Sequence, residues 1–306
     1  MKILALETSA KSVSAAVVED GMVLASAYQN IGLTHSVTLM PLVDAMLQHA
    51  ALSAQDMGLI AVAAGPGSFT GLRIGISAAK GLAWALDLPC CGVSTLEAMA
   101  ENVRNFDGTV ICAMDARRQQ IYNAVFDCRE GVLSRRCEDR AVALEVLAED
   151  IINDKNRKII VGDGAKLCYT YLLEKGISCR MAGADSLYQK ASGVGLLAQR
   201  MAAEGRTVTA QELRPVYLRL SQAERERLAK CLSEAPFGFE VFPSDANFLL
   251  VRVGDADRLY KALVARGIIV RNRTRVQQCA GCLRITIGLA AENDLLLDAL
   301  REEIQA

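Results

Sequence analysis

Alternating apolar and polar positions at the start of the chain predict a small antiparallel sheet. Strands are expected at residues 3–6, 12–18 and 22–28. The segment Glu19-Asp20-Gly21 separates the last two strands, and an Asp-Gly pair between alternating apolar runs is a strong hairpin signal. The chain is therefore expected to open with three antiparallel strands.

The apolar spacing becomes helical over residues 36–50, where apolar side chains cover more of the helix than one buried face needs. A strand is expected at 59–63, and a second helix from Gly71 to about Leu86 is rich in small residues that permit close helix approach. Two interpretations follow. Either both helices pack only on their own sheet, or a partner protein covers their outer faces.

A similar succession of elements returns in the middle of the chain. A short strand near 89–93 and a helix from Ser94 precede further strands at 110–114, 121–127 and 131–137. Helices and strands then alternate as far as about residue 205. Strands followed by alternating helices, twice over, predict two similar α/β lobes.

The last quarter of the chain has a different pattern of predicted elements. A charged helix is expected over about 220–235, and it is followed by short strands and helices. Their expected ranges are 239–242, 248–253, 255–266, 268–270, 283–288 and 292–304. This pattern predicts a separate third segment.

Composition narrows the class of protein. The 306 residues are 52% hydrophobic and carry a formal net charge of −1, whereas a protein that binds nucleic acid alone needs a basic surface. The ten cysteines are scattered, and the neighbours Cys90 and Cys91 would point to opposite faces of a strand, unlike a secreted disulfide framework. The start has no signal-peptide pattern, and no apolar run approaches the roughly 20 residues that span a bilayer. A cytoplasmic protein without membrane contact is expected.

The segment Gly65-Pro66-Gly67-Ser68-Phe69-Thr70-Gly71 lies between a predicted strand and a predicted helix, where backbone N–H groups can hold an anion. Its glycine spacing is one residue too long for a dinucleotide site, and Phe69 would crowd a pyrophosphate. The simpler interpretation is a tight turn in which Thr70 caps the helix.

Metal chemistry has little support in the sequence. The two histidines, His35 and His49, lie 14 residues apart along one helical stretch, which separates them by about 21 Å. Cys279 and Cys282 form a single Cys-x-x-Cys with no second pair at zinc-ribbon spacing. No metal site is predicted.

Several blocks in the first three quarters closely resemble the bacterial TsaB family. They are residues 3–9, 65–75, 92–96, 115–118 with Tyr122, and 215–219. The resemblance covers about residues 1–225, and the Gly-Pro-Gly-Ser-Phe-Thr-Gly block is highly specific to it. It implies an α/β fold of two lobes like the actin and sugar-kinase ATPases, the ASKHA class with ribonuclease H-like lobes.

The resemblance also implies a partner. TsaB proteins pair with TsaD, which transfers the threonylcarbamoyl group to adenosine in tRNA, and the ATPase TsaE joins them. ATP or ADP and Mg²⁺ would then belong to the partner complex, tRNA would be reached only through it, and a homodimer through the same helices is left open. The residues expected at the partner interface are His35, Leu39, Leu42, Val43, Met46, Phe69, Thr70, Arg73, Ile74, Ser77, Ala78 and Gly81.

The internal cleft is expected to be vestigial. ATPases of this architecture approach phosphate with glycine-bearing hairpins, but the first such position here is Glu7-Thr8-Ser9, where the family more often has Asp than Glu. The second hairpin position, in the other lobe, is Asp115-Ala116-Arg117-Arg118, where side chains occupy the space that a phosphate would need. The residues predicted to line this cleft are Glu7, Thr8, Ser9, Asp115 and Arg117. A non-catalytic subunit is therefore favoured, and the alternative is an independent ATP-binding phosphotransferase-like enzyme.

The tail resembles the small domain of histidinol-phosphate aminotransferases, through blocks at 224–248, 267–273 and 281–288. In that family the arginine matching Arg284 grips the substrate carboxylate, and Asn247 is assigned to the same vestigial site. The large domain, with its Schiff-base lysine and phosphate cup, has no counterpart here, so neither pyridoxal phosphate nor transamination is expected. A pyridoxal-phosphate enzyme is the third hypothesis.

The expected organisation is thus a first lobe at 1–105, a second lobe at 106–224 and an aminotransferase small-domain fragment at 225–306. A gene fusion and an error of sequence assembly both explain the junction, and the sequence leaves both open. Without the rest of its parent domain, the fragment is expected to expose apolar strands.

Overall fold

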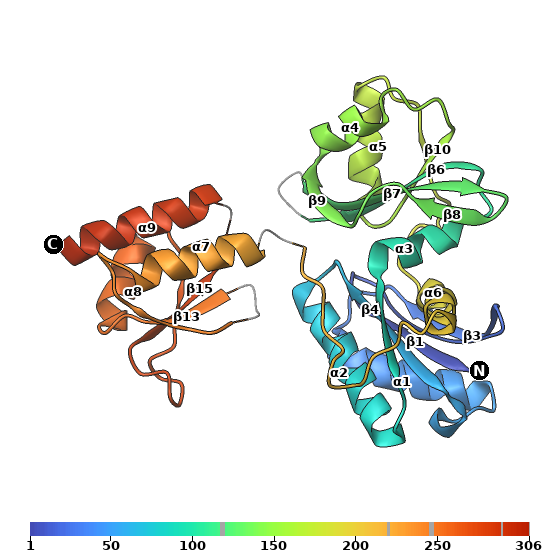
Figure 1. Cartoon of the computed structure of the whole chain (residues 1–306), viewed down its shortest axis with the longest axis horizontal. Coiled ribbons are helices and arrows are strands. Elements are labelled where there is room, and N and C mark those ends of the chain that lie inside the picture. The colour runs from blue at the N-terminus through green and yellow to red at the C-terminus, as the bar shows by residue number, and fades with distance from the viewer. Residues whose placement is uncertain (117–119, 219–220, 245–247, 289, 306) are drawn as a thin grey trace. The chain divides into compact units, whose positions relative to one another are not determined.

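The structure is a computed structural model that describes residues 1–116, 120–218, 221–244, 248–288 and 290–305. The chain divides into two compact units, Met1–Leu218 and Arg219–Ala306, which are described separately (Figure 1). The sequence places the corresponding junction at 224/225, whereas the compact units divide a few residues earlier.

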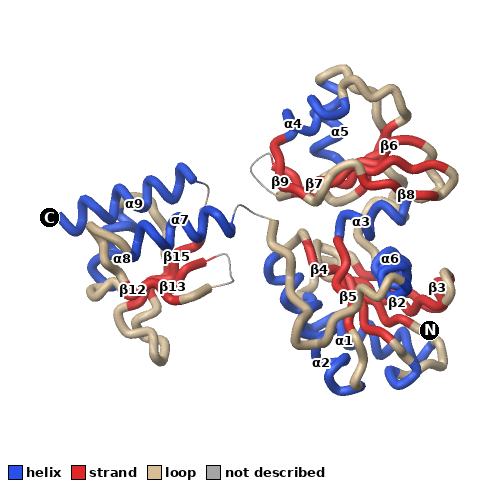
Figure 2. Tube along the Cα trace, viewed as in Figure 1, coloured by secondary structure: helices blue, strands red, loops and turns tan. Residues whose placement is uncertain are grey.

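The first unit begins with a five-stranded sheet, whose strands are drawn in red in Figure 2. The strand order is β3-β2-β1-β4-β5. Strands β1, β2 and β3 are antiparallel, and β4 and β5 run parallel to β1. Asp20 and Gly21 at the first hairpin have φ angles of 49° and 78°, as the Asp-Gly signal predicts. The strands are β1 Ile3–Glu7, β2 Val13–Glu19, β3 Met22–Gln29, β4 Leu59–Gly65 and β5 Cys90–Ser94.

The second sheet repeats this topology. Its order is β8-β7-β6-β10-β11, with β9 paired to β7, so each strand takes the place of its counterpart in the first sheet. The directions also match, because β6–β7–β8 are antiparallel and β10 and β11 run parallel to β6. The prediction of two similar α/β lobes is confirmed. The strands are β6 Gly108–Asp115, β7 Gln120–Arg129, β8 Val132–Arg135, β9 Arg140–Ala143, β10 Lys158–Val161 and β11 Arg180–Met181.

Helices cover both faces of the first sheet. Leu4 and Leu6 of β1 pack toward α1 and α2, and the alternate residues Ile3 and Ala5 pack toward α6. The helices of this unit are α1 His35–His49, α2 Phe69–Leu86, α3 Thr95–Ala100, α4 Leu144–Ile151, α5 Ala165–Glu174 and α6 Ala191–Ala203, with short 3₁₀ turns at Ala54–Asp56 and Glu101–Val103.

The final helix of each lobe contacts the sheet of the other lobe. Helix α6 follows the second sheet in sequence but packs on β1, β2, β4 and β5 of the first sheet, while α3 follows the first sheet and contacts β6 and β7 as well as β4 and β5. After α6 the chain stays on the first lobe, where Val208 pairs with Cys90 and Leu213 enters the core. The division of the first unit at residue 105 therefore separates the sheets but not all of the helices.

The second unit is an antiparallel sheet of four strands with helices packed on it. The strand order is β12-β13-β15-β14. Its strands and helices are β12 Glu240–Phe242, β13 Phe248–Arg252, β14 Arg271–Asn272, β15 Cys282–Thr286, α7 Ser221–Ser233, α8 Ala256–Ala265 and α9 Ala290–Gln305. Leu228, Leu249, Leu263, Leu283 and Leu300 are among the residues of a core that this unit forms from its own side chains.

Most expected elements appear, with shifted ends. The strand expected at 268–270 is absent: the Ile268 N–H is hydrogen-bonded to the Leu263 carbonyl and Val270 is buried in the core, so pairing begins only at Arg271. All ten cysteines are free thiols, which agrees with the expectation of no disulfide framework. Among the described residues, no helix is long and apolar enough to cross a membrane.

Candidate functional site: a groove between two helices

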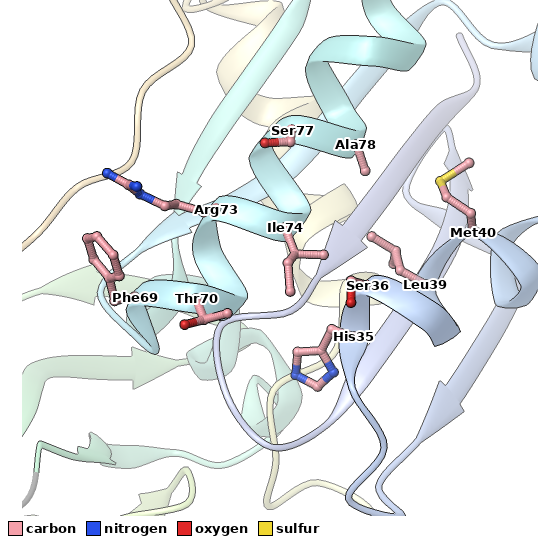
Figure 3. Close-up of a pocket in the computed structure, with 10 residues that line it drawn as sticks. All are labelled: His35, Ser36, Leu39, Met40, Phe69, Thr70, Arg73, Ile74, Ser77 and Ala78. Atoms are coloured by element: carbon pink, nitrogen blue, oxygen red, sulfur yellow. The ribbon is translucent and has the colours of Figure 1, made fainter. Parts of the chain in front are cut away.

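A groove of about 560 Å³ lies between α1 and α2 on the outer side of the first lobe (Figure 3). Eight of the predicted interface residues line it, which brings together side chains from two helices that are 30 or more positions apart in the sequence. They are His35, Leu39, Phe69, Thr70, Arg73, Ile74, Ser77 and Ala78, and Ser36 and Met40 complete the lining.

The first wall of the groove is the start of α1. The ring Nε2 of His35 donates to the Ala10 carbonyl oxygen at 2.7 Å, which ties this end of the helix to the loop after β1. Leu39, only 1% exposed, packs into the core beneath the groove, while Val37 and Met40 on the same helix are 70% and 42% exposed. The wide apolar stripe read from the sequence therefore leaves apolar side chains uncovered.

The second wall is α2, which begins at Phe69 rather than Gly71. Ser68 is the N-cap, since its hydroxyl accepts from the Gly71 N–H at 3.3 Å, so the assignment of Thr70 as cap is wrong. Thr70 lies within the first turn of the helix, which leaves its side chain exposed at the groove.

Arg73 is held at the edge of the groove by two aromatic side chains. Its guanidinium carbon lies 4.3 Å from the centre of the Phe69 ring, and its Nε donates to the Tyr217 hydroxyl at 3.1 Å. The Phe69 and Tyr217 rings are themselves 5.1 Å apart. Val216 anchors this segment through a 2.7 Å hydrogen bond from its N–H to the Ala64 carbonyl. Tyr217 was not predicted as a site residue, although it lies in a block that carries the family resemblance.

Two predicted interface residues are corrected by the structure. Val43 and Met46 are 3% and 6% exposed because they pack into the core of the first lobe, so they have no surface to offer a partner. Leu42 is partly buried against the same core. Gly81, in contrast, is exposed, and a Cβ built on it would meet no atom within 4 Å.

Trp84 is an interface candidate that the sequence reasoning missed. Its side chain is 74% exposed, and it is the single tryptophan of the chain. It follows Gly81 by three residues and Ser77 by seven, so helical spacing places the three on one face of α2. The signal was present in the sequence as a large aromatic residue within a helix of small ones.

The glycines of the loop and of α2 serve close backbone packing. Cβ atoms on Gly71 and Gly75 would lie 2.0 Å and 2.3 Å from the Thr8 carbonyl and hydroxyl oxygens. A Cβ on Gly67 would lie 2.5 Å from the Ser9 carbonyl oxygen. The first turn of α2 therefore rests directly on the loop after β1, which explains the glycine spacing without a phosphate.

Glu7, at the start of that loop, is buried and only 1% exposed. Burial raises the pKa of its carboxyl group to about 7, although the Ser9 N–H donates to Glu7 Oε1 at 2.5 Å and acts in the opposite direction. The nearby charge of Asp163 raises the Glu7 pKa further.

Asp163 is a cleft residue that the sequence reasoning did not find. Burial raises its pKa, while a 3.0 Å hydrogen bond from Gln189 Nε2 opposes the shift and Asp115 adds to it. Glu7, Asp115 and Asp163 thus share one electrostatic environment. The signal was the Gly162-Asp163-Gly164 segment, which follows β10 as the glycine-rich loop follows β4.

The remaining cleft predictions are placed as follows. Thr8 and Ser9 are buried in the loop after β1, and Asp115 is exposed at the end of β6. Arg117 lies outside the described residues. Within the described part of the chain, no group of three or more His, Cys, Asp or Glu side chains could hold a metal ion.

Arg284, the predicted remnant of an aminotransferase site, lies on β15 directly opposite Arg271 on β14. Burial lowers the pKa of its guanidinium group, and the neighbouring Arg273 and Arg271 lower it further. Asn247 lies outside the described residues. Lys230 and Lys261 are exposed on α7 and α8.

The first unit is a two-lobed α/β protein whose two sheets share one topology, with a groove between α1 and α2. Comparison with known proteins shows that the chain belongs to the TsaB family. It is 34% identical over 227 residues to the tRNA threonylcarbamoyladenosine biosynthesis protein TsaB of Bacillus subtilis, a match that covers 73% of this chain and 96% of that protein. The Escherichia coli TsaB is also 34% identical, over 72% of this chain and 95% of the relative.

Two further comparisons agree with this membership. The family profile for TsaD, tRNA N6-adenosine threonylcarbamoyltransferase, matches residues 29–226. The solved structure of YeaZ from Pseudomonas aeruginosa is 28% identical and superposes with a TM-score of 0.61, covering 71% of this chain and 99% of that one. The role that these matches support is in tRNA threonylcarbamoyladenosine biosynthesis.

The second unit is similar to a different family. The histidinol-phosphate aminotransferase of Parabacteroides distasonis is 63% identical over 78 residues, which are 26% of this chain but only 23% of that protein. The profile for class I and II aminotransferases matches residues 167–300, so its range overlaps the TsaD match. The chain therefore spans about a quarter of the aminotransferases that it resembles.

Proposed function

We propose that this chain is a non-catalytic partner subunit in the synthesis of tRNA N6-threonylcarbamoyladenosine, and that it docks a TsaD-type transferase at the groove between α1 and α2. The observation that carries the proposal is the groove itself. Met40 is an exposed apolar side chain in its lining, Trp84 is exposed on the same face of α2 as Ser77, and both helices already have a packed core beneath them.

The residues of the groove have the character of an interface centre. Tryptophan and arginine are the residue types that most often dominate binding energy, and Arg73 is held in place by Phe69 and Tyr217 before any partner arrives. The exposed face of α2 carries small residues, which let a partner helix approach closely. They are Ser77, Ala78 and Gly81. These features favour another helical surface as the occupant.

The catalytic parts belong to the partner complex in this proposal. ATP or ADP, Mg²⁺ and a TsaE-type ATPase act there, and tRNA reaches the first unit only through the complex. The close packing of Gly71 and Gly75 on Thr8 supports this division, because it leaves the glycine-rich loop no open cradle for a phosphate. A homodimer through the same groove would compete with TsaD.

Isothermal titration of TsaD from the same source into the full chain tests the proposal. Ser77→Arg places a long charged side chain in the groove and is expected to weaken binding at least tenfold. Thr170→Arg, which makes the same change at an exposed position on α5 of the second lobe, is the matched control and should bind like the unaltered chain. Equal affinity of both variants, or no binding by the unaltered chain, would reject the docking surface.

The same titration with residues 1–218 shows what the second unit does to docking. Similar affinity of both chains would mean that the second unit has no effect on docking. Binding by the shorter chain alone would mean that the second unit blocks the groove. The shorter chain is suitable because residues 1–218 form a compact unit and whole TsaB proteins match this part of the sequence.

We also propose that the second unit carries out no transamination. It spans only about a quarter of its aminotransferase relatives, and its lysines Lys230 and Lys261 are exposed on helices. Borohydride reduction of the chain in the presence of pyridoxal phosphate, followed by mass spectrometry, is expected to show no stoichiometric adduct on a single lysine. A single fully labelled lysine would contradict this.

A further inference from the structure

The sheet of the second unit has one face turned away from the helices. Its core-facing positions are Leu249 and Val251 on β13 and Leu283 and Ile285 on β15, all in the core with α7, α8 and α9. Because side chains alternate along a strand, the residues between them occupy the opposite face. On that face are Glu240, Phe242, Phe248, Leu250, Arg252, Cys282, Arg284 and Thr286, of which Cys282 is fully buried and the others are at least partly exposed.

One row of side chains crosses this open face from edge to edge. Phe242 on β12 pairs with Leu250, Leu250 pairs with Arg284, and Arg284 pairs with Arg271 on the far edge. The row extends roughly 14 Å at the usual spacing of strands. Phe242 and Leu250 belong to no core cluster of the described residues, so this apolar end of the row is not needed for the core of the unit.

Two of the aromatic rings on this face carry a stacked guanidinium group. Arg284 Cζ lies 5.0 Å from the centre of the Phe248 ring, and Arg252 Cζ lies 5.0 Å from the centre of the Phe242 ring. A guanidinium group is flat, so one that covers a ring presents a second flat surface on its outer side. The face therefore offers stacking surfaces for planar groups.

The charge of this region points to an anion. Arg271, Arg273 and Arg284 lie close together here, whereas Arg252 on the same face is already paired with Glu240. Arg271 and Arg284 sit directly opposite each other, and like charges in such a pair cost stability. The Nε of Arg284 is also buried without a hydrogen-bond partner among the described residues. A bound anion would reduce the repulsion between the two guanidinium groups and would accept a hydrogen bond from Arg284 Nε.

We propose that this open face is a binding surface for single-stranded RNA. Bases would stack on the outer sides of the Arg252 and Arg284 guanidinium groups, which the rings of Phe242 and Phe248 support, while Arg271 and Arg273 pair with phosphates. This combination of planar surfaces and cations on an open antiparallel sheet suits unpaired nucleotides. An acidic peptide would satisfy the charges but leave the rings unused. The inference does not depend on the groove of the first unit.

Fluorescence anisotropy of a labelled oligouridine decamer with the full chain tests the inference. Phe248→Leu keeps an apolar side chain but removes the ring, and it is expected to weaken binding about tenfold. Arg271→Gln removes one phosphate contact, so it should weaken binding and reduce the slope of log K against log salt by about 0.7. Phe248→Trp, which restores a ring, is expected to retain affinity and shows that a loss in Phe248→Leu is not a folding defect.

Lys261→Gln is the matched control, because it removes an exposed cation from α8 rather than from the sheet face, and it should bind like the unaltered chain. Residues 1–218 should not bind the decamer. The proposal is overturned if the full chain leaves the anisotropy unchanged, or if Phe248→Leu and Arg271→Gln bind as the unaltered chain does. It is equally overturned if polyglutamate displaces the decamer as well as unlabelled RNA does.

Discussion

Thr8 and Gly71 are packed backbone against backbone. The Thr8 hydroxyl donates to the Gly71 carbonyl oxygen at 2.7 Å, and a Cβ on Gly71 would lie 2.0 Å from the Thr8 carbonyl oxygen. This contact fixes the first turn of α2 on the loop after β1. Since Phe69, Thr70 and Arg73 belong to that part of the helix, the same contact positions one wall of the groove.

Gly71→Ala is therefore expected to destabilise the first unit. The new methyl group collides with backbone rather than with a flexible side chain, so the free energy of unfolding should fall by about 3 kcal/mol, despite the better helix propensity of alanine. Urea unfolding of residues 1–218, followed by circular dichroism, measures the change.

Gly81→Ala provides the matched control within the same helix. Its added methyl group meets no atom within 4 Å, so alanine should raise stability by about 0.5–1 kcal/mol through helix propensity alone. Equal effects of the two substitutions would show that the Thr8 contact does not constrain α2.

Glu7 makes the stability of the first unit depend on pH. Its carboxyl pKa is about 7 in the folded state against an ordinary value of 4.5, so the folded chain retains this proton over a range in which the unfolded chain has released it. The contribution of Glu7 is most favourable below about pH 4.5 and declines as the pH rises toward 7, by about 3 kcal/mol in total. Above pH 7 the penalty stays constant.

Glu7→Gln removes this titration while preserving the shape of the side chain. The stability of the unaltered unit relative to this variant is expected to fall between pH 5 and pH 7, as measured by urea unfolding of residues 1–218 at each pH. Asp163→Asn is a useful companion, because Asp163 raises the Glu7 pKa and its loss should move the decline to lower pH. Parallel pH profiles for the unaltered unit and Glu7→Gln would contradict the assignment.

The two units are expected to unfold separately, because each has its own core. Leu263 is fully buried among side chains of the second unit alone. Leu263→Ala should lower the free energy of unfolding of that unit by about 2–5 kcal/mol and leave the transition of the first unit unchanged. Differential scanning calorimetry of the full chain, compared with residues 1–218, identifies each transition. A single transition that shifts as a whole would show that the units are coupled.

Local sequence patterns were sufficient for much of the fold. The Asp20-Gly21 turn follows from the special backbone angles that it requires, and the repeated order of elements predicted two lobes that share one sheet topology. Helix α6 could not be placed in this way. Its apolar residues show that it is buried but not on which sheet, and it lies on the sheet of the other lobe.

The site was predicted less completely, for a physical reason. Apolar periodicity does not distinguish a side chain that faces its own core from one that faces a partner. Val43 and Met46 were therefore assigned to the partner interface, although both are buried in the core. Asp163 was missed because its proximity to Glu7 exists only after two lobes meet. Tyr217 was missed as a site residue because its contact with Arg73 joins residues 144 positions apart.

ATP is expected not to stabilise this chain. In the first lobe, Gly67 and Gly71 lie against the backbone of Ser9 and Thr8, so the N–H groups of this loop do not surround a free space. A ligand that binds only the folded state at 100 times its Kd raises stability by about 2.7 kcal/mol, which thermal unfolding detects easily. Saturating ATP with Mg²⁺ should therefore leave the Tm of residues 1–218 unchanged. A shift that disappears in Asp115→Ala would instead favour an independent phosphotransferase-like enzyme, because Asp115 ends β6 at the position where such a cleft would hold the cation.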